Sequence, residues 1–155
     1  MIDQLVETWR INNRANLLLL NAISDEALHD SIFEKGKESP AKQFAHIHNV
    51  RFWKLEKLDK ALVDGQSKLS RSDDILHELL RIKLLKSADA VATILKDGFE
   101  NDGVIEGFRR GASALLGYLI SHESHHRGNM MLIMRQCGYK LPKSVTYGLW
   151  DWNKI

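Results

Sequence analysis

The clearest structural signal in this chain is the stretch Ala112–Cys137, ASALLGYLISHESHHRGNMMLIMRQC. Its apolar side chains recur at intervals of three, four or seven residues, which is the period of one face of an α-helix. The resulting stripe comprises Leu115, Leu119, His122, His126, Met130, Ile133 and Cys137. Gly138 follows the last periodic residue, where glycine favours the end of a helix. The pattern predicts a long helix whose stripe faces the interior of a bundle.

Three further segments show helical spacing of their apolar residues. They run from about Ile2 to Ile23, from Ser39 to about Leu62, and from Ser72 to about Lys96. Ser39 suits an N-cap, and Pro40 suits the first helical position because its missing N–H would be unpaired there anyway. Four long helical segments with almost no strand signal predict one all-α domain over residues 1–155, most simply a four-helix bundle.

The remaining segments are connections and a tail. Gly98 and Gly103 mark a break before the last long helix, and Val104–Arg109 is expected to form a short strand or an extended linker. Beyond Leu141, the tail carries Trp150 and Trp152 close together. Such a tail is expected to pack back onto the domain.

Composition excludes several classes of function. The chain has 22 basic and 20 acidic residues and a net charge of +2, with no basic tract, so nucleic-acid binding has no electrostatic support. One cysteine, Cys137, rules out an intrachain disulfide and fits a reducing cytoplasm. The N-terminal stretch MIDQLVETWR lacks the pattern of a signal peptide, and no apolar run is long enough to cross a membrane. We therefore expect a cytoplasmic protein without membrane or nucleic-acid partners.

The histidines of the last helix are the strongest functional signal. His122 and His126 are four residues apart, so their imidazoles project from the same helix face one turn apart. An unpaired buried imidazole costs about 1–3 kcal/mol, and a divalent metal would satisfy both rings at once. The alternative is a pair of histidines bonded to buried polar partners. His125 lies off the stripe and is expected at the surface.

A metal site needs a third protein ligand, and His46 and His48 are the candidates. Helical phase does not separate them, because both fall at the margins of the apolar stripe of their segment. His29 and His77 are expected to play no part in the site. Cys137 lies three turns beyond His126, roughly 16 Å along the axis, which is too far to share a metal with it.

Two more polar residues follow these histidines closely. Arg127 and Asn129 are placed to contact a ligand at the mouth of the site. A solvated role, or a role in pairing helices, is an equally good interpretation of both residues.

His122–His126 also spells H-E-x-x-H, the helix motif of metallopeptidases, in which Glu123 would be the general base. The metzincin extension of that motif is absent, since Asn129 and Leu132 stand where it requires glycine and histidine. Peptidases of this kind usually hold substrate against a strand edge, and this chain has hardly any strand signal. A peptidase is therefore the weakest interpretation, and Glu123 is expected to be an ordinary exposed helix residue.

The chain resembles the DinB family, the DinB/YfiT-like metalloenzymes. The resemblance rests on three stretches, FAHIHNVR at Phe44–Arg51, HESHHRGN at His122–Asn129 and YGLWDW at Tyr147–Trp152. It implies a four-helix bundle with an unusual helix order and frequent homodimers. It also implies a divalent metal, often zinc or nickel, held near one end of the bundle by three histidines. Carried onto this sequence, those ligands are His46, His122 and His126.

Family members with known activity include thiol S-transferases that use low-molecular-weight thiols. The resemblance thus implies a metal-dependent enzyme that activates a thiol, or water, for transfer to a small electrophile. The alternative is a non-catalytic protein that binds a metal or a small ligand. An enzyme leaves one metal position open, whereas a structural site is closed by a fourth protein ligand. A bundle without any metal is the third possibility.

Overall fold

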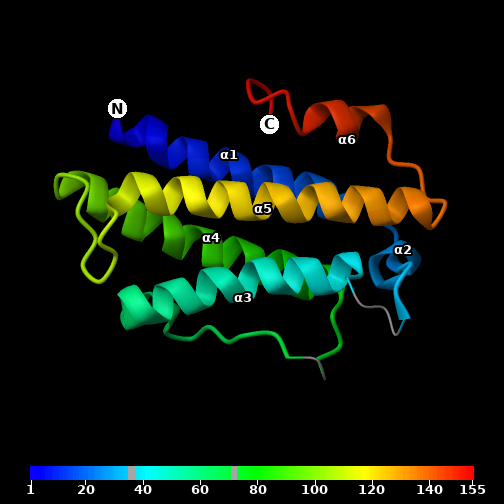
Figure 1. Cartoon of the computed structure of the whole chain (residues 1–155), viewed down its shortest axis with the longest axis horizontal. Helices are drawn as coiled ribbons and strands as arrows, with labels where there is room; N and C mark the ends of the chain where they lie inside the picture. Colours follow the sequence, from blue (N-terminus) through cyan, green and yellow to red (C-terminus); the bar gives the residue numbers. More distant parts are fainter. Residues whose placement is uncertain (35–37, 71–72) are drawn as a thin grey trace.

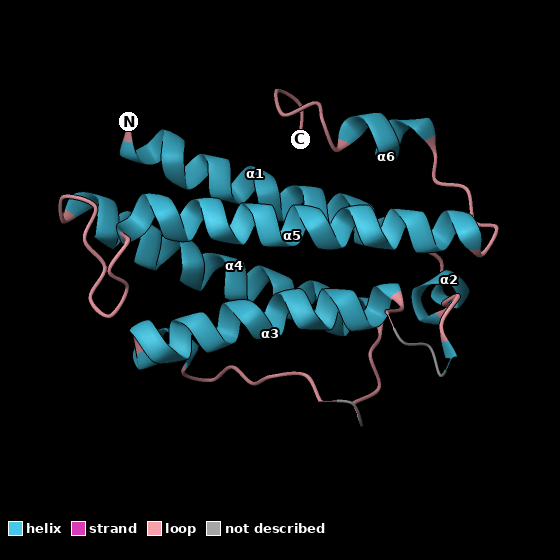
Figure 2. Ribbon diagram, in the orientation of Figure 1, coloured by secondary structure: helices cyan, strands magenta, loops and turns pink. Residues whose placement is uncertain are grey.

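The computed structural model describes residues 1–34, 38–70 and 73–155, and all the regular elements found there are helical (Figures 1 and 2). They are α1 (Ile2–Asn21), α2 (Asp25–His29), α3 (Pro40–Leu58), the 3-10 helix η2 (Lys60–Val63), α4 (His77–Glu100), α5 (Gly111–Gln136) and α6 (Lys143–Gly148). Within the described segments, strand-like pairing is limited to one isolated bridge between Ile105 and Phe108. The all-α prediction is confirmed.

Helices α1, α3, α4 and α5 form the bundle. Helices α1 and α3 each pack against both α4 and α5. The described parts of the connection between α3 and α4, residues 59–70 with η2 and residues 73–76, run back along the bundle. Helices α3 and α4 therefore point in the same direction, and α1 and α5 in the opposite one (Figure 1). The bundle is therefore not a simple up-and-down one. None of the helices in the described part of the chain is long and apolar enough to span a bilayer.

The helix ends follow from local chemistry, with two corrections to the sequence-based boundaries. Helix α3 ends at Leu58 rather than Leu62 because Asp59 takes an extended conformation before η2. Helix α4 begins at His77; the predicted start at Ser72 lies outside the described residues. It continues to Glu100, so Gly98 is not a break. A Cβ on Gly98 would lie 2.7 Å from the Ile105 side chain, and glycine is what permits that close approach.

The predicted end of the last helix is confirmed at Gly138. This residue has a φ of +92°, the left-handed conformation that glycine adopts without strain. The N–H of Tyr139 donates to the carbonyl of Met134 at 2.9 Å, and that of Gly138 to the carbonyl of Arg135 at 3.2 Å. These two bonds form a Schellman motif, which satisfies carbonyls that the helix end leaves unpaired.

Two short helices were not predicted. Helix α2 begins where the Ser24 hydroxyl accepts the N–H of Ala27 at 3.2 Å. Helix α6 lies in the tail, which packs back onto α1 as expected. The contact is made by buried Val145 and Leu149, whereas Trp150 is 79% exposed. The tail thus packs back as predicted, through Val145 and Leu149 and not through Trp150.

The core is divided along the bundle axis into two hydrophobic clusters. One cluster is centred on Leu19, Phe44 and Leu80, and the other on Trp9, Leu95 and Leu115. On each of the four long helices, buried polar residues lie between the part that joins one cluster and the part that joins the other. They are Asn12, Asn13, Asn16, Arg51, Ser87, Glu123 and Arg127. We call these residues the polar layer. The histidines of interest come from the same level of α3 and α5.

Candidate metal centre

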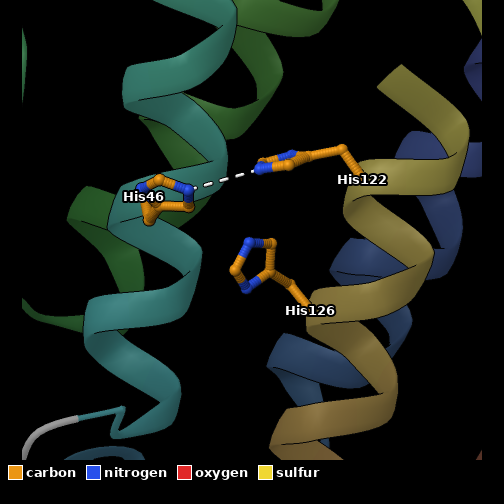
Figure 3. Close-up of side chains that lie close together, drawn as sticks. All are labelled: His46, His122 and His126. Atoms are coloured by element: carbon orange, nitrogen blue, oxygen red, sulfur yellow. Dashed lines mark hydrogen bonds between the residues drawn. The ribbon is translucent and has the colours of Figure 1, made fainter. Parts of the chain in front are cut away.

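Three histidines converge between the middle of α3 and the middle of α5 (Figure 3). His46 extends from α3, and His122 and His126 extend from consecutive turns of α5. Their ring centroids are 4.6 to 5.2 Å apart. One nitrogen from each ring can be chosen so that all three lie within 4.8 Å of one another. The cluster lies midway along these helices, not near one end of the bundle as the resemblance implied.

The spacing of the nitrogens fits a divalent ion. The Nε2 atoms of His46 and His122 are 3.2 Å apart. Two nitrogen ligands at the usual zinc distance of about 2.0–2.1 Å lie about 3.3 Å apart in tetrahedral geometry. All three ligand nitrogens lie within 4.8 Å of one another, so no nitrogen–nitrogen distance exceeds the tetrahedral value by more than about 1.5 Å.

The second ring nitrogens of the two α5 histidines differ in their surroundings. His126 Nδ1 lies 3.0 Å from Gln43 Oε1, and Gln43 Nε2 donates to the Glu38 carbonyl at 2.8 Å. Because that donation points Oε1 at the ring, His126 carries its proton on Nδ1 and presents the Nε2 lone pair to the cluster. His122 Nδ1 is buried with no hydrogen-bond partner among the described residues. A hydrogen bond from the second ring nitrogen, such as the one from His126 to Gln43, typically orients an imidazole that binds a metal.

Electrostatics keeps the α5 imidazoles neutral. Burial, followed by the nearby His122 and His46, lowers the pKa of His126 from 6.5 to about 4. Burial, followed by the neighbouring His46, also lowers the pKa of His122 from its ordinary value of 6.5. Both residues therefore retain free lone pairs at neutral pH, as metal ligation requires.

The structure separates His46 from His48, which helical phase could not do. His48 is fully buried on another side of α3, where its ring nitrogens face the carbonyls of Lys83 at 3.1 Å and Ser67 at 2.9 Å. It thus ties α3 to α4 and to the 59–76 connection. His46 is the α3 histidine that faces α5.

The remaining histidines lie outside the cluster, as expected. His125 is exposed, and its Nε2 is 3.2 Å from the Asn129 amide. His77 pairs with Asp25 at 2.8 Å and with the Ile23 carbonyl at 2.7 Å. In the described part of the chain, no fourth histidine, cysteine, aspartate or glutamate joins His46, His122 and His126.

Glu123 corrects the sequence analysis. It was expected to be exposed, but it is fully buried, as is its partner Arg51. The Arg51 guanidinium donates to both carboxylate oxygens, at 2.6 and 2.7 Å. Asn12 and Asn16 each donate to Glu123 Oε2 at 2.7 Å. With its oxygens occupied by four donors and aimed away from the histidines into the bundle, Glu123 is not placed to act as a general base.

The inward face of α5 is therefore rotated from the one predicted. Glu123 and Arg127 point into the bundle together with Leu119 and Met130, while His122 and His126 flank this face half-buried. Arg127 donates to Asn16 Oδ1 at 2.7 Å, which makes it a residue that pairs α5 with α1. The stripe was placed wrongly because charged residues were assumed to face solvent, whereas a paired charge can occupy the core.

Sequence reasoning also missed Gln43 and Arg51. Gln43 lies three residues before His46 and is 2% exposed. The sequence signal that could have indicated its role is a polar residue one turn before a candidate metal ligand. Arg51 lies one turn beyond the apolar face position of Ile47. An arginine inside an apolar stripe can indicate a buried ion pair, although its partner on a distant helix leaves no local signal.

Comparisons with known proteins show which family the chain belongs to. The profile of the DinB family matches residues 1–153. The chain is also 21% identical to the "Uncharacterized protein YrdA" of Bacillus subtilis (strain 168) over 172 aligned positions, which cover 99% of this chain and 93% of that protein. No solved structure matches the chain. Since the family profile covers nearly the whole sequence, the chain belongs to the DinB family.

Proposed function

We propose that this protein is a divalent-metal-dependent enzyme that activates a thiol, or water, for transfer to a small electrophile. His46, His122 and His126 are the proposed ligands, and zinc or nickel is the proposed metal. The observation that carries the proposal is the convergence of three imidazoles from two helices with no fourth ligating residue in the described part of the chain. A site with three protein ligands leaves a position for a substrate atom, as in catalytic zinc centres.

The chain's own residues supply binding and orientation. The α5 imidazoles stay neutral through burial, and Gln43 fixes the tautomer and ring direction of His126. The polar layer behind them fixes the rotation of α5 relative to α3 through the Arg51–Glu123 pair. A divalent ion held at this cluster would lower the pKa of a thiol or water and so supply a nucleophile at neutral pH.

Metal analysis tests the site directly. Protein purified without chelator is expected to carry about one ion per chain, as a three-histidine centre requires. His46→Ala, His122→Ala and His126→Ala should each lose the ion while keeping the helical circular dichroism of the wild type. His125→Ala is the matched control, because this exposed histidine is on the same helix. Equal metal content in all five proteins would contradict the proposed site.

The second candidate function is non-catalytic binding of a metal or a small ligand. Thiol consumption by the metal-loaded protein, with low-molecular-weight thiols and an aryl halide as electrophile, separates the two. Turnover that disappears in His122→Ala supports the enzyme. A stoichiometric metal without turnover of thiol or water supports the binding protein.

The proposal also includes a homodimer in a reducing, cytoplasmic environment. The lone Cys137 supports the environment, and the family resemblance suggests the dimer. Light scattering coupled to size-exclusion chromatography measures the oligomeric state, and a monomer at micromolar concentration would contradict that part of the proposal.

A further inference from the structure

We propose that the surface between α3 and α5 beside the three histidines binds a small organic anion, whose carboxylate or phosphate pairs with Lys54 while its other end reaches the metal centre. This inference rests on the proposed function and names the substrate class of the same site. It is carried by the contacts of Lys54 and Tyr118, which the three-histidine cluster does not explain.

Tyr118 connects the histidines to a lysine. It lies one turn before His122 on α5, and its ring stacks on the His122 imidazole with a centroid distance of 5.9 Å and an interplanar angle of 18°. The Lys54 ammonium, which extends from α3, lies over the Tyr118 ring at 4.7 Å from its centroid. The sum of these two distances is the upper limit on the separation between the Lys54 ammonium and the centroid of the His122 ring. A small molecule is long enough to span it.

Lys54 is a cation held in place without a counter-ion. It is half-buried on α3, and its ammonium is also 5.8 Å from the centroid of the Phe108 ring. Within the described residues, no carboxylate forms an ion pair with Lys54. Contact with aromatic faces attracts and orients a cation but leaves its charge uncompensated. An anion that arrives here therefore gains a charge-assisted hydrogen bond without displacing a protein partner.

The loop before α5 borders this part of the surface and is held by backbone hydrogen bonds. The loop between α4 and α5 lies beside the C-terminal end of α3 (Figure 1). Backbone bonds hold it closed, from Ala112 N to Gly103 O at 2.8 Å and from Gly111 N to Phe108 O at 2.9 Å. Arg109 and Arg110 follow Phe108 in this loop, and both are exposed. Asp102 and Glu106 are the acidic residues of the loop; both are exposed, and neither forms an ion pair with Lys54 in the described structure.

These features define the ligand by its chemistry. One end must carry a group that binds a divalent metal, such as a thiol. The middle must tolerate contact with the Tyr118 and Phe108 rings, and the far end must carry a negative charge for Lys54. A thiol with an uncharged tail lacks the last of these interactions.

Two thiols of equal length test the inference, 6-mercaptohexanoate and 6-mercaptohexanol. Their binding to the metal-loaded protein is measured by isothermal titration calorimetry, after metal analysis of the same sample. We expect the wild type to bind the carboxylate about tenfold more tightly, as one partly exposed hydrogen bond between charged groups provides. Lys54→Met, which keeps the apolar stem, should abolish this preference and leave the metal content unchanged. Lys54→Arg should retain most of the preference.

Lys57→Met is the control, because Lys57 is exposed on the same helix. It should bind both thiols as the wild type does. Equal affinity of the two thiols for the metal-loaded wild type overturns the inference while leaving the proposed function standing. The same holds if Lys54→Met keeps the tenfold preference. Absence of any bound metal overturns both the proposed function and this inference.

Discussion

Replacing Glu123 with glutamine isolates the contribution of the polar layer. The carboxylate is fully buried and accepts four hydrogen bonds, two of them from Arg51. A glutamine of nearly the same shape has one acceptor oxygen, so its NH₂ group would face donors of Arg51, Asn12 or Asn16. The variant also leaves the Arg51 guanidinium buried without a counter-ion. Removing one partner of a buried ion pair costs about 3–5 kcal/mol.

Such a loss is measurable without unfolding the protein outright. Domains of this size have free energies of unfolding of about 5–15 kcal/mol, and each kcal/mol lowers Tm by roughly 2–4 °C. Glu123→Gln should therefore lower Tm by roughly 6–20 °C, measured by circular dichroism on metal-free protein. Urea unfolding at 25 °C gives the free energy directly. The histidines face away from Glu123, so metal stoichiometry in the folded variant should be unchanged.

The control is Glu78→Gln. Glu78 forms an ion pair with Arg81 on the surface of α4, at 2.8 Å, and its loss should leave Tm close to that of the wild type. A destabilisation by Glu123→Gln below about 1 kcal/mol would refute the reasoning, because it would mean that the buried carboxylate is not needed to compensate Arg51. Preserved stability with lost turnover would instead return Glu123 to the catalytic role that the H-E-x-x-H motif suggested.

Three more predictions follow from the site and its supports. Gln43→Leu removes the acceptor that orients His126 and should weaken zinc affinity about 10–100-fold in a competition titration with a chromophoric chelator, with little change in Tm. In metal-free protein the pKa of His126 is about 4, against 6.5 in an ordinary environment, so the unfolded chain takes up the proton first as the pH falls. The contribution of neutral His126 to stability is therefore complete above pH 6.5 and is lost as the pH falls toward 4, and His126→Gln should flatten this pH dependence of the free energy of unfolding in urea. Gly111→Ala should destabilise the fold by about 1–3 kcal/mol, because Gly111 has a φ of +76° and a Cβ there would collide with the Gly103 carbonyl, whereas Gly117→Ala, in an open helical position, should be neutral or stabilising.

Local patterns were sufficient to find the long helices and part of the site. Apolar periodicity placed α1 and α5 to within a few residues, and Gly138 marked the end of α5 correctly. The spacing of His122 and His126 predicted two imidazoles on one face, and the structure brings them within 4.6 Å between centroids. These features depend on residues within a few turns of each other, so they are readable from the order of amino acids.

The sequence analysis failed where the partners are distant in sequence. Glu123 looked like a surface residue because its counter-ion, Arg51, lies 72 positions away on another helix. For the same reason, helical phase did not distinguish His46 from His48, since the distinction depends on whether α4 or α5 covers each face of α3. Gln43 was overlooked because its role is visible only once α5 places His126 beside it.

The helical class of this protein and the pair of histidines on its last long helix could be predicted from the order of amino acids, because both depend on local periodicity and on backbone preferences. The folded bundle was needed to show which α3 histidine completes the cluster, which charges are buried, and where Lys54 meets Tyr118. Those outcomes depend on the order and rotation of the helices, and this packing is set by long-range contacts that residue spacing along one helix does not contain.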